Sequence, residues 1–151
     1  MIFVEALEDD PESLDIVVTI LRSQITIFRT VKVSAAKRDL TLQQFGVLRL
    51  LSQKGTLPMK ALSDELRVTP PVITGIIDRL EEKGLVKRTR TSQDRRTTEI
   101  ELKESGKSEY RKIQADYRSS IHESLQRSLL PVEQETLAKL LKRFVRAIPV
   151  Q

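Results

Sequence analysis

Residues 62–85 constrain the fold of this chain more than any other segment. Thr69 and Pro70 predict a helix start, with threonine at the N-cap and proline at the first helical position, where its missing N–H costs nothing. Apolar residues then recur at helical spacing along one narrow stripe: Ile73, Ile76, Ile77 and Leu80. Gly84 predicts the helix end, because glycine readily adopts the left-handed conformation found there. With a shorter helix over about residues 59–66 and a turn between them, the pattern indicates a helix-turn-helix.

A charged hairpin is predicted directly behind the second helix. Residues 98–102 alternate with the period of two that is typical of a strand, and residues 86–90 are compatible with a partner strand. The segment KRTRTSQDRRTT (residues 87–98) holds five Arg or Lys among twelve residues, with no apolar residue to anchor it. A basic hairpin behind a helix-turn-helix is a wing, and its charge favours an anionic partner. A solvated surface loop is the alternative.

Long helices are predicted at both ends of the chain. From Pro11 to about Lys37, one apolar stripe comprises Leu14, Val17, Val18, Leu21, Ile25 and Phe28, and a second comprises Ile16, Ile20, Ile27 and Val31. Because a surface helix needs only one stripe, the second predicts contact with another copy of the chain. A helix central to a single core is the alternative. Two further striped helices are predicted from about residue 105 to 129 and from Pro131 onward.

The predicted fold class is mainly α with a small β-hairpin wing: a winged helix-turn-helix flanked by long N- and C-terminal dimerisation helices. The predicted domains are residues 1–38, 39–103 and 104–151. The winged domain should begin with a helix capped by Thr41, with Gln44 completing a capping box, and Gly55 should end that helix. A chain of 151 residues with 39% apolar content suffices for about one domain with a packed core.

Charge and cysteine content narrow the class of protein. The formal net charge is +5, yet residues 1–20 carry six acidic residues and no Lys or Arg, so this end should lie away from a polyanion. The absence of cysteine excludes disulfides, thiolate metal sites and thiol-based sensing. No apolar run approaches the roughly 18–20 residues of a membrane span, and the acidic start disfavours a signal peptide. We therefore expect a soluble cytoplasmic protein.

Three passages resemble the MarR family of transcriptional regulators. They are LSDELRVTPPVITGIIDRLEEKGLVKR (residues 62–88), DRR (residues 94–96) and IELKESG (residues 100–106). The resemblance implies that residues 40–106 form the winged helix of this family and that the terminal helices form its dimerisation region. It also implies a homodimer on double-stranded DNA, with recognition helices in successive major grooves of a pseudo-palindromic site and wings in the flanking minor grooves. Transcription is then typically repressed until a small-molecule effector weakens binding.

The second helix of the helix-turn-helix is the predicted recognition helix. Its N-terminal part should lie closest to base edges, which selects Pro70, Pro71, Thr74 and Gly75. The prolines and the Thr74 methyl group suit thymine methyl groups, and the Thr74 hydroxyl suits a base or a phosphate. Because helix N-termini favour phosphate, Thr69 and Thr41 are predicted phosphate contacts, with capping alone as the alternative. Arg79 is expected to meet a phosphate or a guanine, with an intrahelical salt bridge as the alternative.

In the wing, the resemblance implies that Asp94 holds Arg96 and that Arg96 enters a narrow minor groove, where negative potential is concentrated. The other basic residues of the hairpin are predicted phosphate contacts: Lys87, Arg88, Arg90 and Arg95. Two positions depart from the family pattern. Gly75 stands where a longer polar side chain is common, and Thr91 stands where many relatives carry an acid. The first departure shifts base reading from the helix towards the wing.

No pattern in the sequence is typical of an enzyme, and we expect no catalytic residue, cofactor or metal. The single histidine, His122, is predicted within a terminal helix, without a carboxylate pair, a phosphate loop or metal-ligand spacing around it. Two alternatives to a ligand-responsive repressor remain: a winged-helix module that binds proteins, and an architectural or activating DNA binder without a ligand. The effector, the operator and the regulated genes cannot be predicted.

Overall fold

The computed structural model describes residues 11–90 and 98–149. Within these residues the chain forms six helices and three short strands. In chain order they are α1 (Pro11–Ala36), α2 (Leu42–Lys54), β1 (Leu57–Pro58), α3 (Met59–Leu66), α4 (Pro70–Glu82), β2 (Val86–Arg90), β3 (Thr98–Leu102), α5 (Glu104–Ser128) and α6 (Pro131–Ala147). The predicted fold class is confirmed. None of the described helices combines the length and the apolar character needed to cross a membrane.

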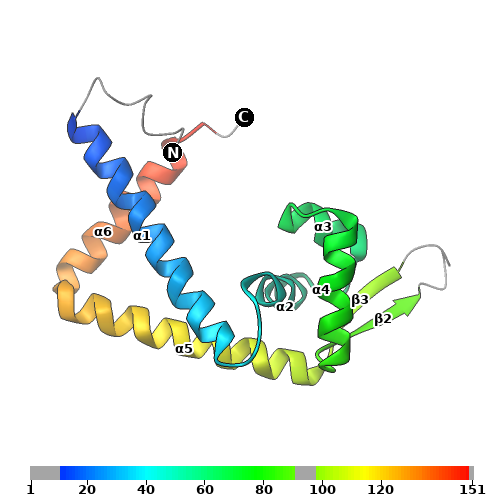
Figure 1. The fold of residues 1–151 in the computed structure, drawn as a ribbon. Coiled ribbons are helices and arrows are strands. Elements are labelled where there is room, and N and C mark those ends of the chain that lie inside the picture. The colour runs from blue at the N-terminus through cyan, green and yellow to red at the C-terminus, as the bar shows by residue number, and fades with distance from the viewer. Residues whose placement is uncertain (1–10, 91–97, 150–151) are drawn as a thin grey trace.

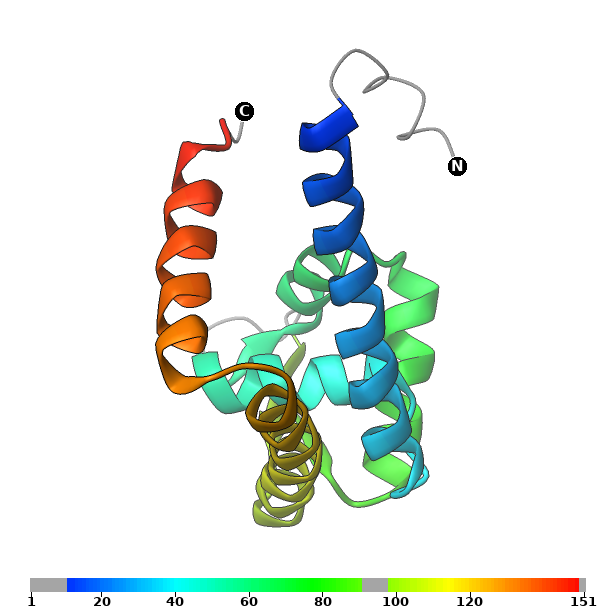
Figure 2. The same ribbon diagram turned by 90° about the vertical axis from the view of Figure 1, so that its left-hand side faces the viewer.

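The elements divide into a winged end and an end made of long helices (Figure 1). Helices α2, α3 and α4 lie around the small sheet at one end, while α1 and α6 extend at the other. Helix α5 runs from the sheet to the base of α6 and so connects the two ends. After a quarter turn of the molecule, α1 and α6 are seen to rise from α5 as two separate arms (Figure 2).

One aliphatic core lies where the two ends meet. Fully buried side chains from α2, α3, α4 and β3 form its centre, including Leu48, Leu62, Ile77 and Ile100. Ala35 of α1 and Ile113 of α5 are buried in the same cluster. The predicted domain boundaries after residues 38 and 103 therefore fall within a shared core, and the long helices are joined to the winged end by packing.

The sheet has three antiparallel strands in the order β1-β3-β2. Strands β2 and β3 form the predicted hairpin, with Val86 opposite Leu102 at its base. Strand β1 was not predicted; its Leu57 pairs with Ile100 on the other edge of β3. A strand of two residues has no periodicity, so the sequence pattern carries no sign of it.

Local signals set the helix ends of the winged part. The Gln44 N–H donates to the Thr41 hydroxyl (3.1 Å) and the Thr41 N–H donates to the Gln44 side chain (2.9 Å), which confirms the predicted capping box. Gly84 follows α4 with a φ of 68°, as predicted. Thr69 occupies the N-cap of α4 as predicted, although its hydroxyl makes no capping hydrogen bond within the described chain. Pro71, the second residue of the helix, has no N–H to offer a cap, so only the N–H of Val72 remains as a partner of the usual kind.

Asp39 closes the junction between α1 and α2 in the left-handed conformation, with a φ of 54°. The Leu40 N–H donates to the Ala35 carbonyl (3.1 Å) and the Asp39 N–H to the Ala36 carbonyl (3.0 Å), which is the Schellman pattern of a helix end. The Lys83 ammonium, at the end of α4, donates to the carboxylate of Asp39 and lowers the pKa of that carboxyl. A lowered pKa means that the pair stabilises the fold above the ordinary pKa of aspartate and ceases to do so as the pH falls through the lowered one.

Candidate nucleic-acid interface

Helix α4 presents one face to the core and the opposite face to solvent. Its buried side chains are those of the predicted stripe: Ile73, Ile76, Ile77 and Leu80. The residues of this region predicted to approach DNA are all exposed: Thr69, Pro70, Pro71, Thr74, Gly75 and Arg79. Val72, with 44% of its surface exposed at the start of the helix, was not predicted. Successive residues of a helix are rotated by about 100°, so Val72 points away from the stripe that contains Ile73. Helical periodicity could therefore have predicted its exposure.

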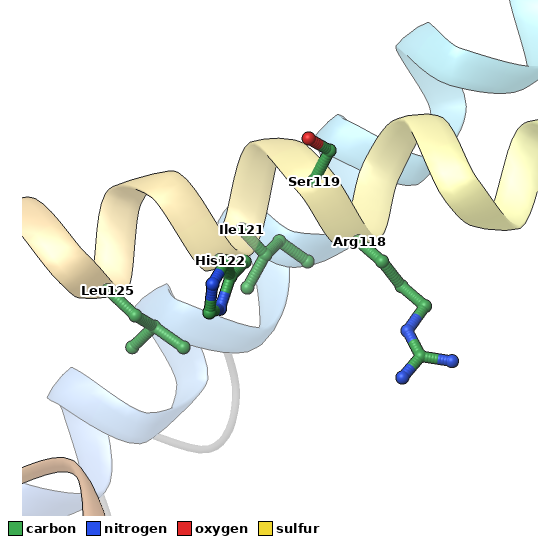
Figure 3. A pocket seen from close by; sticks show the side chains of 5 residues that line it. All are labelled: Arg118, Ser119, Ile121, His122 and Leu125. Atoms are coloured by element: carbon green, nitrogen blue, oxygen red, sulfur yellow. The ribbon is translucent and has the colours of Figure 1, made fainter. Parts of the chain in front are cut away.

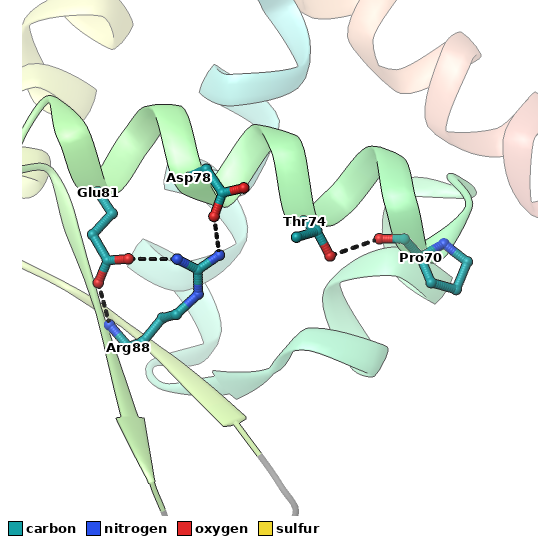
Figure 4. Close-up of polar contacts among 5 residues, drawn as sticks. All are labelled: Pro70, Thr74, Asp78, Glu81 and Arg88. Atoms are coloured by element: carbon teal, nitrogen blue, oxygen red, sulfur yellow. Dashed lines mark hydrogen bonds and ion pairs between the residues drawn. The ribbon is translucent and has the colours of Figure 1, made fainter.

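The hydroxyl group of Thr74 is engaged within the helix. It donates to the carbonyl oxygen of Pro70 at 2.9 Å (Figure 4). Threonine often makes this bond in a helix, because the carbonyl four residues earlier lies within reach. Donation from Thr74 to a phosphate or a base acceptor would require the helical bond to break, whereas the hydroxyl oxygen can still accept a hydrogen bond from a base amino group.

Packing within the chain does not require a glycine at position 75. A methyl group on Gly75 would meet no atom of the chain within 4 Å. Glycine in an exposed helix interior costs roughly 1 kcal/mol relative to alanine, so folding alone does not explain it. The open space in front of Gly75 is available to an external molecule.

Arg88, which was predicted to bind phosphate, joins β2 to α4 (Figure 4). Its guanidinium group donates to the carboxylates of Asp78 and Glu81, and its backbone N–H donates to Glu81 at 3.1 Å. Partial burial lowers the pKa of Arg88, but the bonds to the two carboxylates outweigh this effect and raise that pKa above its ordinary value. Arg88 therefore stays charged and neutralises two acidic groups on α4.

The other described polar residues of the interface differ in how they are engaged. Lys87 pairs with Glu101 across β2 and β3 at 2.8 Å, and both side chains are nearly half exposed, so a phosphate could replace this weak partner. Arg79 makes no ion pair within residues 11–90 and 98–149, so the intrahelical salt bridge given as its alternative is not observed there. The Thr41 hydroxyl accepts the capping bond, which leaves its own proton available.

The tip of the predicted wing lies outside the described residues. This applies to Thr91, Asp94, Arg95 and Arg96 and to the side chain of Arg90. The contacts predicted for these residues stay predictions. The described part of the hairpin, β2 and β3, projects beyond α4 at the end of the molecule (Figure 1).

Comparison with known proteins decides the family. Residues 40–98 match the sequence profile of the MarR family. Over 107 residues the chain is 36% identical to the HTH-type transcriptional regulator FarR of Neisseria gonorrhoeae, a match that covers 69% of this chain and 73% of FarR. The chain belongs to the MarR family.

Two further comparisons extend the MarR-family match over most of the chain. The HTH-type transcriptional regulator MhqR of Bacillus subtilis is 30% identical over 133 residues, which is 87% of this chain and 90% of MhqR. The crystal structure of the apo form of MarR from E. coli superposes with a TM-score of 0.77 at 25% identity, covering 83% of this chain and 93% of that one. The resemblance read from the sequence is confirmed, and this MarR-family protein is a DNA-binding transcriptional regulator.

The long helices of this MarR-family protein expose much apolar surface. On α1 the exposed apolar side chains are Ile16, Leu21, Ile25, Ile27, Phe28 and Val33, and on α6 they include Leu137, Leu140, Leu141, Phe144 and Val145. A groove of about 700 Å³ lies between the two helices and is lined mainly by apolar side chains of both. Among the described residues of α6, none is buried. This helix thus has an apolar face that its own chain does not cover.

Two smaller cavities lie along α5. One, of about 560 Å³, lies between α1 and α5 and is lined largely by serine and threonine residues. The other, of about 410 Å³, extends along α5 from Arg118 to Leu125 and includes His122 (Figure 3). His122 is exposed. In the part of the chain that the structure describes, no three His, Asp or Glu side chains come together in a way that could hold a metal ion.

Proposed function

We propose that this protein is a repressor that binds a pseudo-palindromic operator as a homodimer and releases it when a small molecule binds. The observation that carries the proposal is the exposed face of the N-terminal half of α4, which lies opposite the buried Ile73 and Ile76. A helix presented in this way fits the major groove of B-DNA. We place its action in the cytoplasm, where it meets DNA, and assign it no catalytic activity.

The described residues of α2 and α4 divide into base and phosphate contacts. Those assigned to base edges are Pro70, Pro71, Thr74 and Gly75. Thr41 stands at the start of α2, where backbone N–H groups and the helix dipole favour phosphate. Thr69 stands at the start of α4, where the two prolines offer no N–H, so its phosphate contact is assigned to its exposed hydroxyl and to the helix dipole. Arg79, one turn beyond Gly75 and without a partner among the described residues, is assigned to a phosphate.

In the wing, the predicted role of one basic residue, Arg88, changes, and the other residues keep theirs. Lys87, Arg90 and Arg95 are assigned to phosphates, and Arg96, held by Asp94, to the minor groove. Arg88 is reassigned from a phosphate contact to a brace between the wing and the recognition helix, because its guanidinium group already binds two carboxylates.

The uncovered faces of α1 and α6 support the homodimer. Monomeric soluble proteins rarely leave contiguous apolar patches of this kind in water, and a second copy would bury both faces. A two-fold dimer presents two α4 helices. When their spacing is one helical turn of DNA, about 34–36 Å, they read two half-sites of a pseudo-palindrome.

The cavities along α5 support a small-molecule effector. Both α1 and α5 share the core of the winged end, so a ligand that alters how these helices pack would shift the two recognition helices relative to each other. Repression would follow from occupation of promoter DNA by the dimer, and release of the DNA would restore transcription.

Recovery of genomic fragments bound by the full chain, followed by transcription in vitro from the best fragment, tests the proposal. A small set of fragments sharing an inverted repeat is expected, and added protein should lower transcription from them. If genomic fragments are recovered no better than fragments of shuffled sequence, specific DNA binding is contradicted and the protein-binding module is favoured. If the protein binds specifically but raises transcription, repression is contradicted and DNA binding is not.

A further inference from the structure

The N-terminal half of α4 offers a DNA groove almost no hydrogen-bonding side chain. From Pro70 to Gly75 the exposed groups are two proline rings, the side chains of Val72 and Thr74, and a glycine with none. The only side-chain hydroxyl among them, that of Thr74, donates to the Pro70 carbonyl at 2.9 Å. One turn further on, the carboxylate of Asp78 is held by the Arg88 guanidinium group.

These residue types leave few ways to recognise a base pair. In the major groove, guanine is typically read by Arg or Lys, adenine by Asn or Gln, and cytosine by Asp or Glu. Residues 70–78 contain none of the first four types, and their one acid, Asp78, is neutralised by Arg88. Thymine differs, because its C5 methyl group presents apolar surface that requires no hydrogen-bond donor.

We propose that α4 selects its bases mainly by apolar contact with the C5 methyl groups of thymine. This inference rests on the proposed function, since it assumes that α4 enters the major groove. Pro71 and the methyl group of Thr74 are the central contacts, and Val72 adds apolar surface at the edge. The open space in front of Gly75 allows the helix backbone to approach the base edges closely.

Removal of the C5 methyl groups from the DNA tests this directly. The best-bound sequence is selected from a random duplex library with the full chain and resynthesised with deoxyuridine at the thymidines that face α4. Each methyl group buried against an apolar side chain changes affinity by about fourfold, so loss of several across two half-sites should weaken binding tenfold or more.

A protein variant supplies the matched control. Thr74→Ser keeps the hydroxyl and its bond to Pro70 but lacks the methyl group, so it should bind the thymidine site more weakly and discriminate less against deoxyuridine. Deoxyuridine at flanking positions read by the wing should leave affinity within about twofold, because the C5 methyl group lies in the major groove.

The outcomes separate this inference from the proposed function. Equal affinity for thymidine and deoxyuridine at the positions facing α4 would overturn the methyl contact while leaving DNA binding intact. Failure to enrich any duplex sequence would contradict the proposed function, and this inference with it.

Discussion

Arg67 lies in the turn of the helix-turn-helix in a conformation that suits glycine better. Its φ of 52° is in the left-handed region, which strains any residue that carries a Cβ atom. Arg67→Gly should therefore raise the free energy of unfolding by about 0.5–1 kcal/mol. Arg67→Ala removes the same charge but keeps the strain, so it should change stability by less than about 0.5 kcal/mol. Urea unfolding measures both; equal stability of the two variants would contradict the assignment of strain.

Two substitutions at the wing tip should act in the same direction although they remove opposite charges. Arg96→Ala should weaken operator binding by about 1–3 kcal/mol per half-site, because it removes the proposed minor-groove contact, and should change stability by no more than about 0.5 kcal/mol. Asp94→Ala should also weaken binding, because the aspartate is proposed to hold Arg96. Gel-shift titration measures both. Simple electrostatics predicts tighter binding by Asp94→Ala. That result would show that Asp94 does not hold Arg96 and that the wing is merely a charged loop.

At the scale of elements, the Arg88 brace between β2 and α4 can be separated from a phosphate contact by a mutant cycle. Arg88→Ala alone exposes two unpaired carboxylates on the recognition helix and should weaken DNA binding about tenfold or more. In a background of Asp78→Asn and Glu81→Gln no carboxylate remains to be exposed, so the same substitution should cost less than about threefold. Gel-shift affinities measure the cycle. A loss of equal size in both backgrounds would identify Arg88 as a direct phosphate contact.

The elements of the winged part could be predicted because most of their ends carry local signals. Thr41 with Gln44 begins α2, Pro70 begins α4 and Gly84 follows it, each through backbone chemistry that the residue type dictates. The exposed face of α4 followed from helical periodicity alone. The engagement of Arg88 did not, because its partners lie on another element, seven and ten residues away, and only the folded geometry brings them together. The two-residue strand β1 was not predicted because it is too short to show the alternation of apolar and polar residues that marks a strand.

At the scale of the whole molecule, the uncovered faces of α1 and α6 predict a dimer at micromolar concentration. The two copies should bury roughly 2,000 Å² or more, as obligate interfaces do. A charge at Ile20 or Phe144, both of which line the groove between the arms, should destabilise the fold and the dimer together. Arg146→Glu, a charge change of α6 away from its apolar stripe, is the control and should leave the dimer intact. A folded, monodisperse monomer in sedimentation would contradict the dimer.

The dependence of operator affinity on salt concentration tests the central claim, recognition of DNA by a dimer of winged helices, most directly. Affinity of the full chain for its best site is measured by gel shift between about 50 and 200 mM salt, with the stoichiometry determined in parallel. Each neutralised phosphate contributes about −0.9 to the slope of log affinity against log salt, so the four cations assigned to phosphates in each of two copies predict a slope of about −7. A steep slope with two chains per site is the expected result; a slope near zero, or one chain per site, would contradict the claim.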